Sequence, residues 1–537
     1  MSKKLLLFGM ALMMAFVFSC KNSPETKAGN TETKPPYTIQ LEEIVVPNLP
    51  DLHSFTHGIY QDKIVLIGGR TSGLHAFSYT FAHSLSNDSV FVIDTKNWAD
   101  PQKWTIKSLH FSKIILPNQE DSAKFVTQLQ SPQMMKFLDK RVFYSNNAEF
   151  YTKNNVLYLY GGLIGGPNKS ANSNPTTAPY LTAINLPDII DLVEGNKALK
   201  ANSIRQLYDT SFGITGGEIE IMNNKTYLVF GWHYDNANSQ QYYSHQIKSF
   251  TITDDGTTLT PSAITSWNDG YPNDTDAAVA DNGNYRRRDG TMSAMINPAN
   301  DSNILLYYAG VFKSGATNFT SVVRITDNGV KEIDSNSFTM RSNIYTCQVV
   351  PVFSKSRKES YASLIGGITN TTFNAEGAGN YPIKLTEKTA KIIDTIGKSQ
   401  NFTFVPFTNR ISTVCLNAKG ELSQYMLADS FPPSKNTYHF KDDSVKAGGA
   451  LYNGAESELL WTMDSKYLVN GMINYDALIA TNKDGATVGY IYGGILSSLP
   501  NVLAKGFPAN QNGGSLGYSK ASNRLFRVKI VPLPQIL

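Results

Sequence analysis

Histidines, arginines and carboxylates stand in short polar stretches next to apolar, strand-like runs. Arginine can bind an anion through paired hydrogen bonds, and with histidine and carboxylates it suits an anionic or hydroxylated ligand such as a sugar acid. The stretches are FTHGIY, GRTSGLH, GGEIE, GWHYDN, NYRRRDG and GAESE, and they supply a candidate binding face of His57, Arg70, His75, Glu218, His233, Asp235, Arg286, Arg287, Arg288, Asp289 and Glu456. The competing interpretation is structural, because such groups also satisfy one another and trapped water around a channel.

Motifs with a defined catalytic or metal-binding mechanism are not found. G-x-S-x-G, H-E-x-x-H and C-x-x-C are missing, and the eight histidines do not pair at metal-ligand spacing. We therefore predict no cofactor and no metal, and the catalytic residues stay unassigned. The pattern places Cys347 and Cys415 at equivalent positions of neighbouring inner strands. There they form either two buried thiols, which we favour, or an inter-blade disulfide.

The elements that would position these residues recur along the chain. Each is an apolar strand that ends in a pair of small residues, and the copies are KIVLIGGRTSG, VLYLYGGLIGG, TYLVFGWHYDN, ILLYYAGVFKSG, YASLIGGITNT and GYIYGGILSSL. Most follow another strand through a tight turn, as in EIEIMNNKTYLVFG. Glycine pairs suit the place where the inner strands of radially packed sheets converge, because a side chain there would meet neighbouring backbone.

Strand, turn, strand ending in Gly-Gly, loop and two further strands is the blade pattern of Kelch-type β-propellers, and the chain resembles that class. An all-β fold also agrees with the 28 tyrosines and 27 phenylalanines. The glycine pairs recur at about 75-residue spacing until a last gap that has room for two blades. That gap contains the hairpin pattern RISTVCLNAKGELSQYML. The sequence therefore predicts seven blades, with six and a large insertion as the alternative, and a strand at 37–47 that completes the last blade.

The N-terminal residues have the pattern of an export signal. MSKK precedes LLLFGMALMMAFVF, an apolar run too short to span a bilayer comfortably, and SC follows directly. FVFSC resembles the lipobox of bacterial lipoproteins, which implies a lipid on Cys20. A plain secretory signal, or a membrane anchor with an incidental cysteine, is the alternative. We predict a signal peptide at 1–19, a lipidated cysteine and flexible tether at 20–36, and a propeller domain at 37–537.

Charge and motif order narrow the partners and the location. The net charge is +4, and no basic stripe with interleaved aromatics is present, so nucleic acid is not expected as a partner. The order of LIGGRTSGLH, PYLTAINLPDIID, GAESELL and VGYIYGGILSS resembles uncharacterised Kelch-like proteins exported by Bacteroidota. The resemblance implies a lipoprotein of the outer membrane, on the cell surface or on the periplasmic side.

Two functions fit these observations. The favoured one is a binding or scaffold subunit for a protein partner or a glycan, possible within an outer-membrane complex, because long loops accompany the missing catalytic motifs. The alternative is a carbohydrate-active enzyme, by analogy with sialic-acid isomerising propellers that use Arg, His and Glu on one face. The alternative predicts that Arg70 and His57 converge with a carboxylate around an open pocket. A channel plugged by side chains would contradict it.

Overall fold

The structure is a computed structural model, and it describes most of the chain beyond residue 32. The described residues are 33–74, 86–96, 98–114, 139–164, 176–235, 240–270, 274–275, 283–313, 317–333, 336–369, 371–375, 379–392, 406–502 and 515–534.

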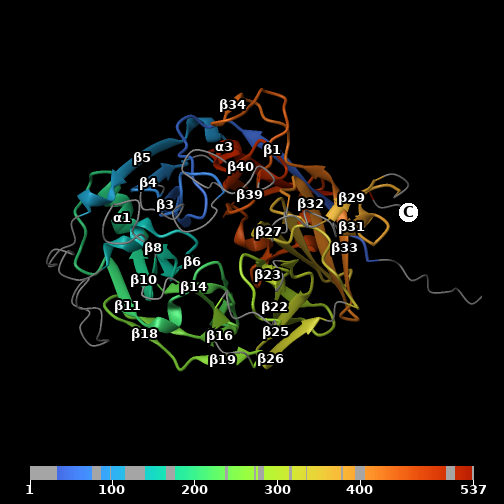
Figure 1. Ribbon diagram of the computed structural model, residues 1–537, viewed down its shortest axis with the longest axis horizontal. Helices are drawn as coiled ribbons and strands as arrows, with labels where there is room; N and C mark the ends of the chain where they lie inside the picture. The colour runs from blue at the N-terminus through green and yellow to red at the C-terminus, as the bar shows by residue number, and fades with distance from the viewer. Residues whose placement is uncertain are drawn as a thin grey trace, which may run out of the picture.

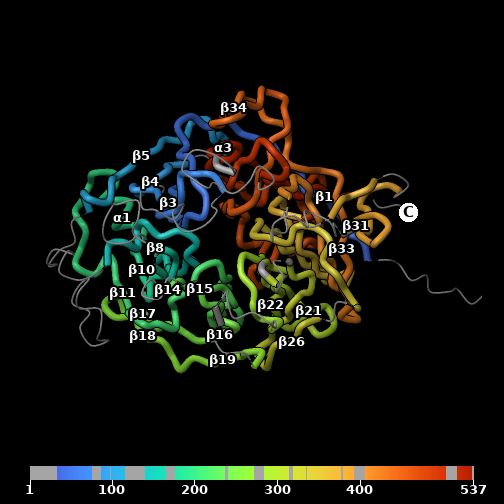
Figure 2. The backbone as a smooth tube through the Cα atoms, viewed as in Figure 1, coloured from blue at the N-terminus to red at the C-terminus, as the bar shows by residue number. Residues whose placement is uncertain are grey.

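Antiparallel sheets stand around a common centre, and the chain passes once around the ring (Figures 1 and 2). Among the described residues, five sheets have four strands each. From the centre outwards, the first four are β2 (Thr56–Tyr60), β3 (Lys63–Ile67), β4 (Ser89–Asp94) and β5 (Thr105–His110); β6 (Glu149–Lys153), β7 (Val156–Tyr160), β10 (Tyr180–Asn185) and β11 (Ile204–Tyr208); β12 (Glu218–Met222), β13 (Lys225–Val229), β16 (Gln246–Phe250) and β19 (Thr265–Asn268); and β21 (Thr291–Asn297), β22 (Ser302–Tyr308), β25 (Val322–Thr326) and β26 (Gly329–Ile333).

The fifth four-stranded sheet closes the ring. Its strands are β36 (Ser457–Trp461), β39 (Ala486–Gly493), β42 (Leu525–Pro532) and β1 (Tyr37–Ile44). β1 pairs antiparallel with β42 from Tyr37 opposite Pro532 to Ile44 opposite Leu525. In Figure 1 the blue β1 accordingly lies beside the red C-terminal strands. The predicted closure, in which an N-terminal strand completes the last blade, is therefore what the strand pairing shows.

The sector between β26 and β36 holds a larger sheet of seven strands. Its order is β30-β33-β32-β28-β27-β38-β37, and β38 pairs with β27 in parallel. The strands are β27 (Gln348–Ser354), β28 (Glu359–Ile365), β30 (Ile383–Lys384), β32 (Arg410–Asn417), β33 (Leu422–Ser430), β37 (Leu468–Val469) and β38 (Met472–Asn474).

The prediction of seven blades is wrong, and so is the alternative of six regular blades. The described part of the ring consists of five four-stranded blades and this seven-stranded sheet. RISTVCLNAKGELSQYML, expected to form a blade without glycines, instead supplies β32 and β33, which continue the sheet of β27 and β28. The wide gap between glycine pairs comes from long connections inside and after this sheet, and spacing alone cannot tell such connections from an extra blade.

Shorter elements decorate the ring. The short strands are β8 (Leu163–Ile164), β9 (Thr176–Thr177), β14 (Trp232–Asp235), β15 (Gln240–Tyr243), β17 (Ile252–Asp254), β18 (Leu259–Pro261), β20 (Asp274–Thr275), β23 (Val311–Lys313), β24 (Thr317–Asn318), β29 (Thr371–Phe373), β31 (Ala390–Ile392), β34 (Tyr438–His439), β35 (Ser444–Val445), β40 (Ile495–Ser497) and β41 (Ser519–Ala521). The α-helices are α1 (Leu186–Val193), α2 (Tyr475–Thr481) and α3 (Ser515–Tyr518). No helix in the described ranges has the length and apolarity needed to cross a bilayer.

The hydrophobic core is divided among the spaces between adjacent sheets. Val65 of β3 and Leu157 of β7 belong to one cluster, which α1 extends with Ile189. A further cluster joins Leu66 of β3 to Tyr490 of β39, so the last and first sheets are packed together as well. β-branched and aromatic side chains suit strands that are buried on both faces, which explains the apolar runs of the repeat.

The glycine pairs sit where a strand reaches the next sheet. Gly161 and Gly162 at the end of β7 have φ of +61° and +83°. A Cβ on Gly161 would lie 1.9 Å from the carbonyl oxygen of Ile214, which belongs to the next sector. Left-handed backbone and close approach therefore both require glycine here. The opening residues of two equivalent pairs, Phe230 and Ala309, adopt the same left-handed φ without being glycine.

Candidate functional site

Six residues close a ring of backbone hydrogen bonds at the end of the channel where the glycine pairs lie. We call them the collar: Ser54, Asn147, Gly216, Asp289, Thr346 and Glu456. Each lies just before an inner strand, and its N–H donates to the carbonyl of the collar residue in the preceding sector, over 2.8–3.4 Å. The ring closes when Ser54 N donates to the carbonyl of Glu456 at 3.2 Å. The seven-stranded sheet contributes Thr346, so it takes its place in the ring beside the five blades.

Backbone strain is concentrated in the collar. Ser54, Asn147, Asp289 and Glu456 have φ between +50° and +54°, although none is glycine. Left-handed backbone costs about 1–2 kcal/mol for an ordinary L-residue, so the hydrogen-bonded ring must hold these residues in place. Strain of this kind, maintained by surrounding structure, is typical of functional or tightly constrained positions.

The Glu456 carboxylate gathers side chains from three sectors. Its Oε2 accepts from Ser54 Oγ and from Asn147 Nδ2, the latter at 3.1 Å, and its Oε1 accepts from Tyr345 OH at 2.6 Å. The ring nitrogen Nδ1 of buried His53 lies 2.7 Å from Ser54 Oγ. Since Ser54 donates to Glu456, the Ser54 hydroxyl proton is already committed. The group therefore binds the collar together and does not present an activated serine nucleophile.

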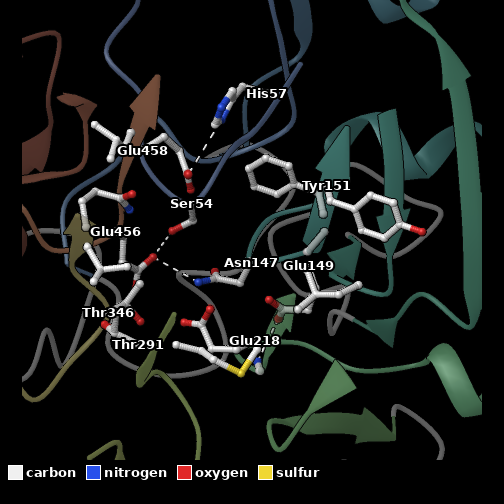
Figure 3. A pocket seen from close by; sticks show the side chains of 18 of the residues that line it. Ser54, His57, Asn147, Glu149, Tyr151, Glu218, Thr291, Thr346, Glu456 and Glu458 are labelled. Carbon is white, nitrogen blue, oxygen red and sulfur yellow. Dashed lines mark hydrogen bonds and ion pairs between the residues drawn. The ribbon is translucent and has the colours of Figure 1, made fainter. Parts of the chain in front are cut away.

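A cavity of about 580 Å³ extends from the collar along the inner strands (Figure 3). One residue from each inner strand lines it just past the collar, and we call this set the acidic layer: His57, Glu149, Glu218, Thr291, Gln348 and Glu458. Side chains alternate along a strand, so positions two residues further on also line the cavity, as Tyr151 and Glu220 do. Among the described lining residues none is Arg or Lys.

Burial among like charges favours the protonated form of these carboxyls. The pKa of Glu149 rises to about 8, mainly because the group is removed from water, although Gly217 N donates to it at 2.8 Å. Burial also raises the pKa of Asp289 to about 7. The pKa values of Glu218 and Glu458 lie well above the usual range because of burial and then the charge of Glu149. A positively charged ligand would reverse these shifts by favouring the ionised carboxylates.

His57 projects from β2 into the cavity. Its Nδ1 lies 3.7 Å from an oxygen of Glu458, and the edge of its ring meets Phe150 with centroids 5.0 Å apart. Burial lowers the pKa of His57 to about 4, so the imidazole is neutral at pH 7. Figure 3 shows His57 pointing towards Glu458 on one side of the cavity and Glu149 and Glu218 on the other.

The structure brings four of the predicted site residues to this cavity, namely His57, Glu218, Asp289 and Glu456. Arg70 is fully buried behind it and does not line it. Its backbone pairs with His53, and burial lowers its pKa to about 10 while the charge of Glu456 opposes that shift. Arg70 therefore supports the collar from outside the cavity. The predicted convergence on an open pocket is met by His57 and a carboxylate, without the arginine.

The remaining predicted residues belong to packing arrangements away from the cavity. The ring of His233 stacks on Tyr242 at 5.1 Å, and Asp235 ends the same strand, β14. The guanidinium groups of the next three residues in the prediction are also engaged: Arg286 lies 3.8 Å over Tyr243, Arg287 is fully buried and donates to Ser321 and Glu332, and Arg288 donates to Gln241 and lies 4.8 Å over Trp232. The single ligand-binding face predicted from these loops is thus divided between the cavity and structural contacts.

Two predicted residues, Cys20 and His75, lie outside the described residues. Cys347 and Cys415 are both buried free thiols, as favoured. They do not occupy equivalent inner-strand positions, because Cys415 lies on β32 and Cys347 directly precedes β27 of the same sheet. Within the described ranges, no group of three or more His, Cys, Asp or Glu side chains is arranged to hold a metal ion.

Sequence reasoning missed Glu149, Glu220, Glu458 and the collar residues Ser54 and Asn147. The signal was present in the strand that precedes each glycine-ended strand. NNAEF, GGEIE and AESEL place Glu149, Glu218 and Glu458 two residues after a turn residue with left-handed backbone. Aligning on these inner strands would have found the acidic layer, whereas alignment on the glycine pairs emphasised the loops that follow.

Comparison with known proteins adds little to this picture. No protein-family model matches the sequence, and no curated protein matches it. A solved structure described as "Structure of YjhT" is similar over 89% of this chain and 99% of its own, at 12% identity and a TM-score of 0.37. The assignment of a β-propeller arrangement therefore rests on the strand pairing and the closed ring described above.

Proposed function

We propose that this protein is a binding protein whose central cavity receives a positively charged, hydrogen-bond-donating group of a partner molecule. One observation carries the proposal: a cavity of about 580 Å³ lined by Glu149, Glu218, Glu220, Glu458 and Asp289, with no Arg or Lys among its described lining residues. Its size lies within the range of about 300–1,000 Å³ usual for ligand sites. The basic group can be a lysine or arginine of a protein partner or the amine of a glycan.

The location belongs to the same proposal. The lipobox-like FVFSC supports a lipid on Cys20, an outer-membrane address and a Kelch-type exported lipoprotein of the Bacteroidota kind. β1 begins at the end of the ring opposite the glycine pairs, since Tyr37 pairs with the far end of β42. An anchor before β1 would leave the collar end pointing away from the bilayer, towards partners that arrive from the aqueous side.

The test is affinity purification of the lipoprotein from solubilised outer membranes, with mass spectrometry of everything retained. Wild type is compared with the double variant Glu149→Gln/Glu458→Gln and with Glu387→Gln, whose carboxylate is 89% exposed on the rim. We expect a stoichiometric partner or bound glycan that the double variant loses and Glu387→Gln keeps. Direct titration with spermidine and with a lysine-rich peptide measures the same site. Equal retention by all three proteins would refute the proposal.

A carbohydrate-active enzyme is the second candidate, supported by one specific observation. The pKa of Glu149 lies near 8 and neutral His57 stands beside Glu458, and a carboxyl that keeps its proton at neutral pH is what a general acid requires. An acidic sugar fits this cavity poorly, because Arg70 does not line it. Hydrolysis of a neutral glycan panel by wild type, lost in Glu149→Gln, would favour this candidate over simple binding.

A further inference from the structure

A second cavity, of about 340 Å³, opens at the edge of the ring where β1, β42 and the β34–β35 hairpin meet. It shares no described lining residue with the channel cavity. Its lining combines cationic, amide, hydroxyl and aromatic groups: Lys520, Arg524, Asn436, Asn523, Thr437, His439 and Tyr438, with Glu43 and Val45 on the β1 side. We infer that this edge cavity binds an acidic sugar, with the carboxylate on Lys520 and Arg524 and the sugar ring against Tyr438.

The cationic part of the cavity is held in place from behind. Arg524 is 2% exposed, and its Nε donates to Glu43 Oε1 at 2.7 Å while Nη2 donates to the carbonyl of Pro432 at 3.2 Å. Its Nη1 is buried and has no hydrogen-bond partner among the described residues. A buried donor left unpaired costs free energy that an incoming acceptor would recover. The guanidinium is therefore fixed and keeps one donor for a ligand.

Charge around the cavity favours an anion. Lys520 and Arg524 stand against one lining carboxylate, Glu43, whose oxygens already accept from Arg524 and from the backbone N–H of Lys435. Asp51 interacts with Lys520 electrostatically but does not line the cavity, and burial raises the pKa of Asp51. One positive charge of the lining is thus left without a lining counter-charge. This is the opposite of the channel cavity.

The aromatic part supports a sugar over a simple ion. Tyr438 has both cations near its ring, with Lys520 Nζ at 5.6 Å and Arg524 Cζ at 6.0 Å from the centroid. Val45, which is 39% exposed, adds apolar surface in the same lining. A sugar acid presents an apolar ring face, a carboxylate and hydroxyls together, and the amides of Asn436 and Asn523 can bind the hydroxyls. A bare inorganic anion would use the cations alone.

The test measures binding of glucuronate, glucose and glucosamine to the detergent-solubilised full chain by ligand-detected NMR and calorimetry. The variants are Lys520→Met and Tyr438→Ala. The chain offers a matched control pair, because Lys466 Nζ lies 4.9 Å over the ring of Tyr467 far from the cavity. Lys466→Met and Tyr467→Ala make the same chemical changes there. Circular dichroism melting shows whether each variant is folded, and Lys520→Met keeps the test valid if Tyr438→Ala unfolds.

We expect glucuronate to bind about tenfold more tightly than glucose or glucosamine, and each cavity variant to weaken it about tenfold, as for loss of one strong contact. The two control variants should bind as wild type does. Equal affinity for the three sugars, or equal effects of Lys520→Met and Lys466→Met, would overturn the inference. Binding of sulfate with the same affinity as glucuronate, unchanged in Tyr438→Ala, would refute the sugar and leave an anion site. Neither result bears on the channel cavity, which contains none of these residues.

Discussion

Replacement of Glu456 by glutamine tests whether the collar is held together by a charged carboxylate. Glu456 accepts hydrogen bonds from Ser54, Asn147 and Tyr345, and its side chain is about as buried as any carboxylate in the structure, at 1% exposed. Its charge also acts on buried Arg70. Glu456→Gln keeps the shape of the side chain, removes the charge and replaces one acceptor oxygen by an NH₂ donor.

The size of the effect follows from the contacts. A hydrogen bond to a charged group contributes about 1.5–3 kcal/mol and a neutral one about 0.5–1.5 kcal/mol, so neutralising the acceptor costs about 1 kcal/mol for each of the three bonds. Loss of the negative charge near Arg70 adds to that cost, because a buried cation is left with less compensation. We expect the free energy of unfolding of Glu456→Gln to fall by about 3–4 kcal/mol.

Equilibrium unfolding in urea at neutral pH, followed by intrinsic fluorescence, measures this change, with Glu458→Gln as the matched control. Glu458 lies two residues further along, and burial and neighbouring negative charge raise its pKa well above the usual range. It is therefore protonated at pH 7, where an amide replaces it with little loss, and the change should stay within about 1 kcal/mol. The reasoning is refuted if Glu456→Gln is as stable as Glu458→Gln.

Three further predictions concern other parts of the molecule. The pKa of Glu149 rises from 4.5 to about 8, so the folded state holds a proton that the unfolded state releases, and the resulting stabilisation is full below pH 4.5 and lost as the pH rises through 8; at about 1.4 kcal/mol per pH unit this reaches at most about 5 kcal/mol, and Glu149→Gln should flatten the pH dependence of urea unfolding. An unchanged slope would count against a buried protonated carboxyl. Gly161→Ala should lower the thermal unfolding midpoint, because its Cβ would lie 1.9 Å from a carbonyl oxygen at φ +61°; a midpoint equal to that of wild type would mean that the neighbouring sector can move away. Burial raises the pKa of the Cys347 thiol to about 12 and that of Cys415 well above its usual value, so iodoacetamide should label both only in denaturant, and rapid labelling of the native protein would contradict their burial.

The radial fold was predictable because its signal is local. A strand that ends in two small residues needs only a few neighbouring letters to be recognised, and the close approach of Ile214 to Gly161 explains why those letters are glycine. The number of blades was not predictable in the same way. Whether 410–427 begins a new blade or extends an old one depends on pairing between β28 and β32, which are separated by a long connection. Sequence spacing carries no record of that choice.

The site was predictable only in part, because residue type does not reveal which way a side chain faces. Arg70 and Arg287 have the chemistry of anion binding, yet both are fully buried and support neighbouring segments. Glu149 and Glu458 looked like ordinary strand residues, and they line the cavity because alternation along the inner strands turns them towards the centre. The edge cavity depends on contact between β1 and β42, whose partners are almost the whole chain apart.

The collar has one more consequence, which concerns how the molecule can come apart. All six N–H groups of the collar donate in the same rotational direction, so the hydrogen bonds form a hoop with no first and no last member. In a solenoid, terminal repeats can be removed and the rest stays folded, since each repeat touches only its neighbours. A hoop has no terminal member to lose: deleting any sector would leave a bare donor on one side and a bare acceptor on the other. The sectors should therefore unfold together, and shortened chains that lack one sector should not fold at all.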